Sequence, residues 1–482
     1  MSEALPEGWE LVVGLEVHCE LATETKLFCG CPNAFGEEPN TNVCPVCLGL
    51  PGSLPVLNRR AVELAMRIGT ALRCSIEPST FHRKNYFYPD MPKDFQISQY
   101  DEPINRGGRL ELPDGSVVGI ERAHLEEDTG KTTHIGGTGR IGGADYALVD
   151  YNRSGVPLVE IVSAPDIRSA AQARAYAGEL RSILIATGSS DGRMEEGSMR
   201  VDANVSVRRE GEGFGTRCEI KNLNSMRSLM RAIDFEASRQ AALLEAGERI
   251  VLETRHWDEG EGRTQSMRSK EEADDYRYFP EPDLVPLAPD RRWQAEVAAA
   301  IPALPSERRA ALSDLVGAPS AAQADQIHSV VASDLDRLVT AASEHGAPAA
   351  LALARTANEV AADPEGASRL DSGAFARLLV LEGSGELSAT QAKEVLAALL
   401  AGGGEPAEIA RSMGYESMDE GALGAVVAEV VAAEPEAWGR FVAGDTKVQA
   451  FFTGKVMAAT AGKANGKAVA AELARLASQA QD

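Results

Sequence analysis

The sequence predicts an α+β fold in which a strand-rich N-terminal part is followed by helices. Residues 10–290 show strand-like and helix-like patterns separated by turns. After the proline-rich stretch 279–289 the composition changes, and the chain becomes alanine-rich with an almost continuous helical period. A short break at 382–386 divides this helical part. We therefore predict three domains, a strand-rich domain over 1–291, a helical domain over 292–386 and a helical tail over 387–482.

Individual elements of the first domain follow from local patterns. Residues 170–187 and 226–246 have apolar residues at helical spacing, and Gly188 and Gly247 follow them as expected caps. Strand-like segments at 146–151 and 156–163 flank a turn and predict a hairpin.

Charge and composition exclude several classes of protein. No apolar stretch is long enough to span a membrane, and the short acidic N-terminus does not resemble a signal peptide. We expect a cytoplasmic protein with reduced thiols and no membrane partner. The net charge of −24 argues against general nucleic-acid binding. From Lys447 onward there are five Lys or Arg and two acids, so any RNA contact should be local.

Three predicted strands carry polar residues on one face. In the segment 11–21 the odd positions are apolar, so the alternation of a strand places Glu16 and His18 together on the opposite face. The segment 198–208 repeats this pattern with Arg200 and Asp202 on its polar face. In 216–221, Glu219 and Lys221 share a face with Arg217.

The alternative is a sheet with one solvated side. Glu160 argues against it, because this residue interrupts the apolar run 157–162, and a buried carboxylate must be paired or bind metal. A further acidic cluster, with one histidine, lies at 124–128. Carboxylate oxygens with one imidazole suit Mg²⁺ or Mn²⁺, and such sites commonly hold nucleotide phosphates.

Four of the seven cysteines lie within nineteen residues. They form two close pairs, Cys29 with Cys31 and Cys44 with Cys47. This spacing favours a structural Cys₄ zinc knuckle. The alternatives are a redox pair at 44–47 and a chance cluster at 29–31.

Several motifs together resemble the B subunit of the tRNA-dependent amidotransferases, the GatB family. Their order and spacing extend over residues 11–290. The motifs are Val13-Gly-Leu-Glu-Val-His18, Arg83-Lys-Asn-Tyr-Phe-Tyr-Pro-Asp90, Glu126-Glu-Asp-Thr-Gly-Lys131, Asp150-Tyr-Asn-Arg153, Met194-Glu-Glu-Gly-Ser198, Asp202-Ala-Asn204, Glu219-Ile-Lys-Asn-Leu-Asn-Ser225 and Asp274-Asp-Tyr-Arg-Tyr-Phe-Pro-Glu-Pro-Asp283.

The resemblance implies a cradle domain similar to the catalytic domain of glutamine synthetase, with an antiparallel sheet, followed by a helical domain and a tail that binds tRNA. It implies an ATP-dependent ligase that works as a heterotrimer with an amidase, the A subunit, and a small C subunit. The carboxylate of glutamate or aspartate misacylated on tRNA(Gln) or tRNA(Asn) would be phosphorylated. Ammonia released from glutamine by the amidase would then displace the phosphate.

The resemblance also implies roles for individual residues. The expected magnesium ligands and catalytic residues are Glu16, His18, Glu127, Glu160 and Glu219. Asp202 is a further candidate, as a metal ligand or at the nucleotide. Arg200 and Lys221 lie on the polar faces of the same predicted strands and are candidates for holding the ATP phosphates, although they could instead balance the charge of the carboxylates. The polar residues expected along the ammonia route are Lys84, Asn85 and Tyr86.

The tail matches the family less closely, because Ala458 stands where a lysine is common and Gly466 where a proline usually follows the asparagine. The candidate tRNA contacts in it are Lys447, Lys455, Lys463 and Lys467. Two other functions compete with the tRNA enzyme: a free-standing ligase acting on a small acid, and a noncatalytic RNA-binding scaffold. A ligase of that kind needs no helical tail, and a scaffold needs no carboxylate-lined sheet. The sequence contains both features.

Overall fold

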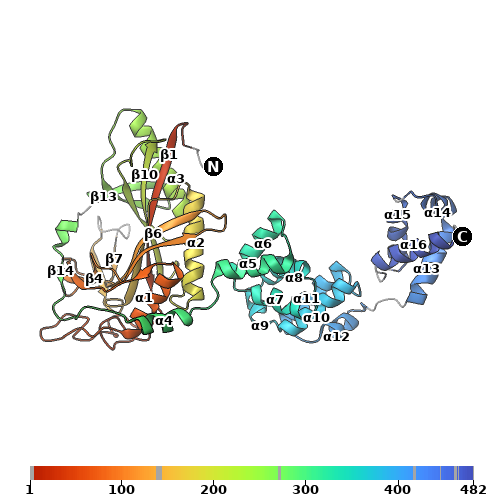
Figure 1. The fold of residues 1–482 in the computed structure, drawn as a ribbon, viewed down its shortest axis with the longest axis horizontal. Helices are drawn as coiled ribbons and strands as arrows, with labels where there is room; N and C mark the ends of the chain where they lie inside the picture. The colour runs from red at the N-terminus through yellow and green to blue at the C-terminus, as the bar shows by residue number, and fades with distance from the viewer. Residues whose placement is uncertain are drawn as a thin grey trace. The chain divides into compact units, whose positions relative to one another are not determined.

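The computed structural model describes residues 5–136, 144–269, 273–415, 420–445, 447–460, 464 and 466–480. The chain forms two compact units, Met1–Ser306 and Glu307–Asp482 (Figure 1). The first contains the strands and the second is helical. This arrangement confirms the predicted α+β class.

A large mixed sheet forms the centre of the first unit. Its strand order is β13-β12-β11-β10-β1-β9-β6-β4-β3-β14, with β5 paired to β6 and β2 to β5. The strands are β1 (Trp9–Glu20), β2 (Ser75–Ile76), β3 (Phe81–Asn85), β4 (Phe95–Gln99), β5 (Asn105–Glu111), β6 (Val117–Glu127), β9 (Pro157–Ser163), β10 (Met199–Arg209), β11 (Cys218–Leu223), β12 (Glu253–Asp258), β13 (Arg263–Ser269) and β14 (Phe279–Pro280). The expected antiparallel sheet needs one correction: β11 and β12 are parallel, because the long helix α3 (Met226–Glu245) connects them.

Strand β1 occupies a central position, since it pairs with β10 on one side and β9 on the other. Its alternation behaves as predicted: Leu15, Val17 and Cys19 are fully buried, whereas Glu16 and His18 are only partly buried on the other face. The apolar residues of β10 are buried in the same core. The sheet therefore presents one apolar face and one polar face.

Helices α1 (Arg59–Ala71), α2 (Ala170–Ala186) and α3 pack in the same core (Figure 1). Asn58, Ser169 and Ser225 cap their N-termini by accepting main-chain N–H groups. The predicted helices over 170–187 and 226–246 are thus confirmed, each followed by a glycine with positive φ.

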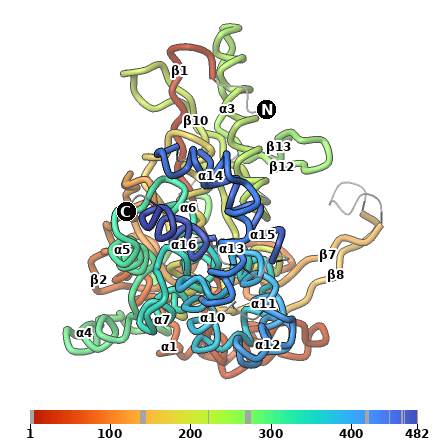
Figure 2. Tube along the Cα trace, turned by 90° about the vertical axis from the view of Figure 1, so that its right-hand side faces the viewer, coloured from red at the N-terminus to blue at the C-terminus, as the bar shows by residue number. Residues whose placement is uncertain are grey.

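The predicted hairpin between 146–151 and 156–163 is wrong. Strand β8 (Tyr146–Asp150) pairs with β7 (Lys131–Ile135) in a separate two-stranded sheet, visible side by side in Figure 2. Strand β9 instead pairs with β1 and β6. The apolar side chains of β9 become buried when the strand lies between two others in the large sheet. A two-stranded hairpin would leave them exposed, and for this reason β9 does not pair with β8.

The first unit continues beyond the predicted boundary at residue 291. Helix α4 (Arg291–Ala299) packs on α1, and the Arg59 guanidinium lies 4.2 Å from the centre of the Trp293 ring. Val297 is buried in the core of the first unit. Between β13 and α4 lies a short 3₁₀ helix, η1 (Ala273–Tyr276).

In the second unit one apolar core gathers side chains from residue 312 to residue 410. The predicted boundary at 386 falls inside it, because Gly385 with positive φ ends one helix and Leu387, which follows, is buried in the same core. The elements here are α5 (Pro305–Val316), α6 (Ala321–Ala332), α7 (Asp336–Glu344), α8 (Ala349–Arg355), η2 (Thr356–Val360), α9 (Pro364–Arg369), α10 (Ser372–Ser384), α11 (Ala389–Gly402) and α12 (Pro406–Ser412).

Four further helices share a separate small core centred on Val427, Phe452 and Leu473. They are α13 (Glu420–Ala433), α14 (Pro435–Val442), α15 (Val448–Ala459) and α16 (Gly466–Gln479). Within the described ranges, none of the helices combines the length and apolar character needed to cross a bilayer.

Candidate functional site

Two histidines and two carboxylates meet on the polar face of the large sheet. His18 Nε2 lies 3.4 Å from Glu160 Oε2 and 3.6 Å from Glu126 Oε1. His124 Nε2 lies 3.6 Å from Glu160 Oε2 and 3.8 Å from Glu126 Oε2. Pairing of β1 with β9 and of β9 with β6 places His18, Glu160 and His124 in one row across three strands. Ligand atoms of His18, Glu126 and Glu160 lie within 4.8 Å of one another, close enough to hold one metal ion.

The electrostatics of this cluster favour charged carboxylates. Burial raises the pKa of Glu160, but the charges of His124 and His18 and a hydrogen bond from His18 lower it well below its usual range. Burial by itself lowers the pKa of His18, whereas the hydrogen bond to Glu160 and the charges of Glu160 and Glu126 raise it to about 9. A divalent cation would take the place of these protons, since metal binding requires a neutral imidazole.

The same face continues onto β10 and β11 with the other predicted residues. Asn204 Nδ2 donates to Glu16 Oε1 at 2.8 Å. Lys221 Nζ lies 2.9 Å from Asp202 and 3.0 Å from Glu219. Glu16 lies directly opposite Asp202 in the β1–β10 pairing. These residues therefore adjoin the histidine–carboxylate cluster as a second acidic group, in which Lys221 pairs with two of the carboxylates.

Arg200 connects this face with the end of β6. It lies opposite His18 in the register of β1 and β10, and its guanidinium donates to Asp128 Oδ2 at 2.7 Å. Arg153 also faces Asp128 at 3.5 Å. Burial, followed by the charge of Asp128, raises the pKa of Glu20 to about 7. A cavity of about 490 Å³ opens here, with Glu20 and Arg153 in its wall.

Glu127 lies apart from the histidine–carboxylate cluster. Its carboxylate pairs with Lys93 and accepts the main-chain N–H of Ile97 at 2.9 Å. It lines a different cavity, of about 310 Å³, together with Cys29, Cys47 and Arg83. The structure thus brings together two predicted ligands, His18 and Glu160, and adds Glu126 and His124, which the sequence had indicated only as members of an acidic cluster.

The three residues expected along the ammonia route lie at the end of β3. Lys84 Nζ is 4.7 Å from the centre of the Tyr276 ring. Asn85 Nδ2 donates to the main-chain oxygens of Tyr276 and Arg277 at 2.9 and 2.8 Å. Tyr86 stacks on Tyr88 with ring centres 4.8 Å apart. The segment that follows η1 is thereby fixed to this edge of the sheet.

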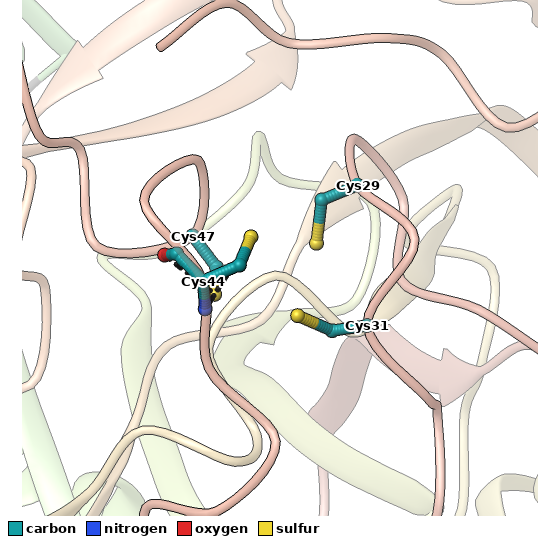
Figure 3. Close-up of side chains that lie close together, drawn as sticks. All are labelled: Cys29, Cys31, Cys44 and Cys47. Atoms are coloured by element: carbon teal, nitrogen blue, oxygen red, sulfur yellow. Dashed lines mark hydrogen bonds between the residues drawn. The ribbon is translucent and has the colours of Figure 1, made fainter.

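The four cysteines of the knuckle converge, two from each of two loops (Figure 3). All four Sγ atoms lie within 4.8 Å of one another, and those of Cys44 and Cys47 are 3.8 Å apart. A tetrahedron with Zn–S bonds of about 2.3 Å has edges of about 3.8 Å. The hydrogen bond from Cys29 is the largest of the effects that lower the pKa of Cys47 to about 5. The cluster could therefore hold a metal ion such as zinc.

The candidate tRNA contacts of the tail differ in their surroundings. Lys455 pairs with Glu434 and lies 5.2 Å from the centre of the Phe451 ring. Lys447 is exposed immediately before α15. Lys467 lies in α16, and Lys463 lies outside the described residues.

Comparison with known proteins agrees with a strand-rich domain followed by a helical region. Residues 11–295 match the GatB/GatE catalytic domain, and residues 338–476 match the GatB domain. The strand-rich unit is thus similar to a class of catalytic domains, and its polar face lies within the matched range.

Full-length relatives support the same assignment. The B subunit of aspartyl/glutamyl-tRNA(Asn/Gln) amidotransferase from Salinispora arenicola is 50% identical, covering 97% of this chain and 96% of the relative. The proteins of the same name from Frankia casuarinae and Moorella thermoacetica are 49% and 48% identical, covering 96% and 95% of this chain and 94% and 97% of the relatives. The chain belongs to the GatB family.

Proposed function

We propose that this chain is the activating subunit of a tRNA-dependent amidotransferase, a carbon–nitrogen ligase that uses glutamine as its amide donor. In this function it phosphorylates the side-chain carboxylate of Glu-tRNA(Gln), Asp-tRNA(Asn) or both. The observation that carries the proposal is the cluster of His18, Glu126 and Glu160 on the polar face of a GatB/GatE catalytic domain. Its partners would be the amidase, or A subunit, and the small C subunit of a heterotrimer in the cytoplasm.

Two carboxylates and an imidazole fit a divalent cation such as Mg²⁺ or Mn²⁺. When bound, the cation supplies charge stabilisation for the phosphoryl group in transfer. We assign Glu16, Asp202 and Glu219 to the neighbouring acidic group as further ligands. Arg200 and Lys221 already pair with carboxylates, which fits charge balance, and we propose that they also contact the nucleotide phosphates.

The reaction then has two steps. A carboxylate oxygen of the aminoacyl group attacks the γ-phosphorus of ATP, the bond to the β-phosphate oxygen breaks, and ADP leaves. Ammonia attacks the acyl carbon of the resulting acyl phosphate, phosphate leaves with the bonding electron pair, and the surplus proton passes to phosphate or solvent. The protein orients the carboxylate and excludes water, because water would hydrolyse the acyl phosphate.

Ammonia must reach this face without escaping to solvent. We propose that Lys84, Asn85 and Tyr86 line its route, as members of the layer that fixes Tyr276 and Arg277. We further propose that the tail lysines contribute affinity for tRNA, and that the cysteine cluster binds zinc in a structural role.

Separate measurements of ADP and amide test the proposal. The purified heterotrimer, with the amidase and the small C subunit present, would be assayed with each misacylated tRNA. His18→Ala should abolish ADP formation that depends on misacylated tRNA, while glutamine hydrolysis by the amidase continues. Glu121→Gln is the matched control, because Glu121 is an exposed residue of the same strand as Glu126. ADP formation at the wild-type rate in His18→Ala would contradict this site, and a complex inactive with both tRNAs would contradict the function.

A further inference from the structure

Lys26 is a buried cation directly before the cysteine cluster. Its side chain has 0% exposure, and Nζ donates to the main-chain oxygens of Asn42 at 2.8 Å and Tyr151 at 3.2 Å. Within the described part of the chain, no carboxylate forms an ion pair with this ammonium group. A buried ammonium without a counter-charge is strongly unfavourable, so neutral carbonyl oxygens alone leave its burial unexplained.

The acid that lies nearby is already neutralised. The Cβ atom that Gly155 lacks would lie 3.6 Å from Lys26 Cδ, 3.7 Å from Cys47 Cβ and 3.9 Å from Glu127 Oε2. Lys26, Cys47 and Glu127 therefore surround one point. The Glu127 carboxylate pairs with Lys93, whereas the cysteine cluster, once loaded with metal, would supply further negative charge beside Lys26.

Four thiolates around one divalent cation carry a net charge of −2. The Lys26 main-chain N–H donates to Cys31 O at 3.0 Å, which fixes the lysine beside the first pair of cysteines. An ammonium in this position compensates half of the charge of the loaded cluster.

Lys26 also contacts the turn that leads to the polar face of the sheet. Its second acceptor, Tyr151 O, belongs to the turn between β8 and β9. Two residues further on, Arg153 donates to Thr129 O at 3.0 Å and faces Asp128, which accepts from Arg200. Polar contacts, together with the backbone of the turn from Tyr151 to Arg153, therefore connect the cysteine cluster with Arg200.

We propose that the Lys26 ammonium is the internal counter-charge of the metal-loaded cysteine cluster and couples metal occupancy to the turn that presents Arg153 to Asp128. The inference rests on the proposed binding of zinc by the four cysteines. Lys26 is a positioning residue here, because it acts through the cluster and the turn and does not contact the reacting atoms.

The test uses the full chain and zinc itself as the probe. Zinc affinity of Lys26→Met would be measured by competition with a chromogenic chelator. Thermal unfolding would be followed in the zinc-loaded and the zinc-free protein. Loss of one nearby unit charge should weaken zinc binding about tenfold or more. Lys26→Met should lower the unfolding midpoint of the zinc-loaded protein. It should leave the midpoint of the zinc-free protein unchanged or raise it, because the variant lacks the buried ammonium that would have no counter-charge without the loaded cluster.

Asn152→Ala is the matched control. Asn152 accepts the Asn42 N–H at 2.8 Å and so ties the same loop to the same turn without a charge. Loss of this hydrogen bond should lower the unfolding midpoints of the zinc-loaded and the zinc-free protein alike. It should change zinc affinity by less than about threefold. If Lys26→Met lowers the unfolding midpoint equally in the zinc-loaded and the zinc-free protein, Lys26 contributes through packing alone, and the inference is overturned.

Lys26→Gln provides a second variant, which keeps an N–H donor. Wild-type zinc affinity in this variant would show that hydrogen bonding is sufficient and that the charge is not needed, which contradicts the inference. Failure of the wild-type chain to bind zinc would contradict the proposed metal site itself, so the two failures are distinguishable.

Discussion

His18 and Glu160 lie opposite each other in the antiparallel pair β1–β9, with Nε2 3.4 Å from Oε2. Glu126 reaches the same imidazole from β6, on the far side of β9. Three strands that are distant in the sequence therefore each contribute one ligand atom to a single place. The geometry suits a cation that is held by the sheet itself and not by a loop.

The adjacent residues Glu126 and Glu127 should have different roles. Glu126→Gln should reduce ADP formation dependent on misacylated tRNA by at least about a hundredfold, because it removes a carboxylate from the metal cluster. Glu127→Gln should retain ADP formation, since Glu127 pairs with Lys93 away from His18. ADP release by the reconstituted complex is the measurement. Loss of ADP formation in Glu127→Gln with normal thermal stability, and its retention in Glu126→Gln, would restore the ligand set expected from the sequence.

Glu126 illustrates both the use and the limit of strand alternation for predicting which residues share the polar face. The alternation that correctly placed Glu16 and His18 also applies to β6, where Ala123 and Leu125 are buried in the apolar core. Glu126 then belongs to the polar face and Glu127 does not. However, the buried apolar residues of β6 are at even positions before Arg122 and at odd positions after it, since the register shifts between Ile120 and Arg122. An irregularity of this kind leaves no clear signal in one sequence.

Other features depended on long-range pairing that the sequence does not contain locally. The helices α2 and α3 were predictable from apolar spacing and terminal glycines, because those signals are local. The pairing partners of β9 could not be predicted, since a short turn at 152–155 suggests a hairpin whether or not one forms. The convergence of the four cysteines was predictable, because short spacing brings the two members of each pair together and only a short loop separates the pairs.

Removal of one thiolate should destabilise the knuckle before it affects catalysis. A structural site has no free coordination position for substrate. The wild-type chain should contain about one zinc by elemental analysis. Cys44→Ser should lose zinc and unfold at a lower temperature, with a smaller change in ADP formation per folded molecule. Cys74→Ser is a control, because Cys74 lies outside the cluster. A zinc-free protein with unchanged stability and full activity would contradict a structural zinc site.

The tail should contribute affinity for tRNA and no catalytic group. Deletion of residues 416–482 leaves the core over 312–410 complete and should raise the apparent KM for tRNA. The salt dependence should become shallower, by about 0.7–0.9 in the logarithmic slope for each lost phosphate contact. Lys447→Gln should show part of this effect. Lys455→Gln should show less, since Lys455 already pairs with Glu434. Unchanged tRNA affinity at every salt concentration after the deletion would contradict this role.

Glu236 should stabilise the first unit in a manner that depends on pH. Its carboxylate is fully buried, accepts from Arg239 at 2.6 Å and lies 3.3 Å from Arg255. Burial raises the pKa of Glu236, but the hydrogen bonds from Arg239 and Gln240 lower it overall. A lowered pKa in the folded state means that the stabilisation is present above the ordinary carboxyl pKa and is lost as pH falls.

Glu236→Gln should therefore lower the free energy of unfolding by about 3 kcal/mol at neutral pH, because it removes the carboxylate that pairs with the partly buried Arg239 and one of the two that face the buried Arg255. The difference in the free energy of unfolding between Glu236→Gln and the wild-type protein should become smaller as pH falls through the acidic range. Chemical denaturation across a pH series measures it, with the exposed Glu248→Gln as control. A difference that does not change with pH would assign the effect to packing.

The central position of β1 has a consequence for synthesis of the chain. Glu16 and its hydrogen-bond partner Asn204 are separated by 188 residues. The ribosome adds about 5–20 residues per second, so β1 must remain without its β10 partner for roughly 10–40 s after it emerges. During that interval its apolar residues and unpaired edges are exposed to other nascent strands. Strand β1 is thus made well before β10 and is fully paired only after β10 has emerged, so a chaperone or ribosome-bound factor would have most to protect at this strand.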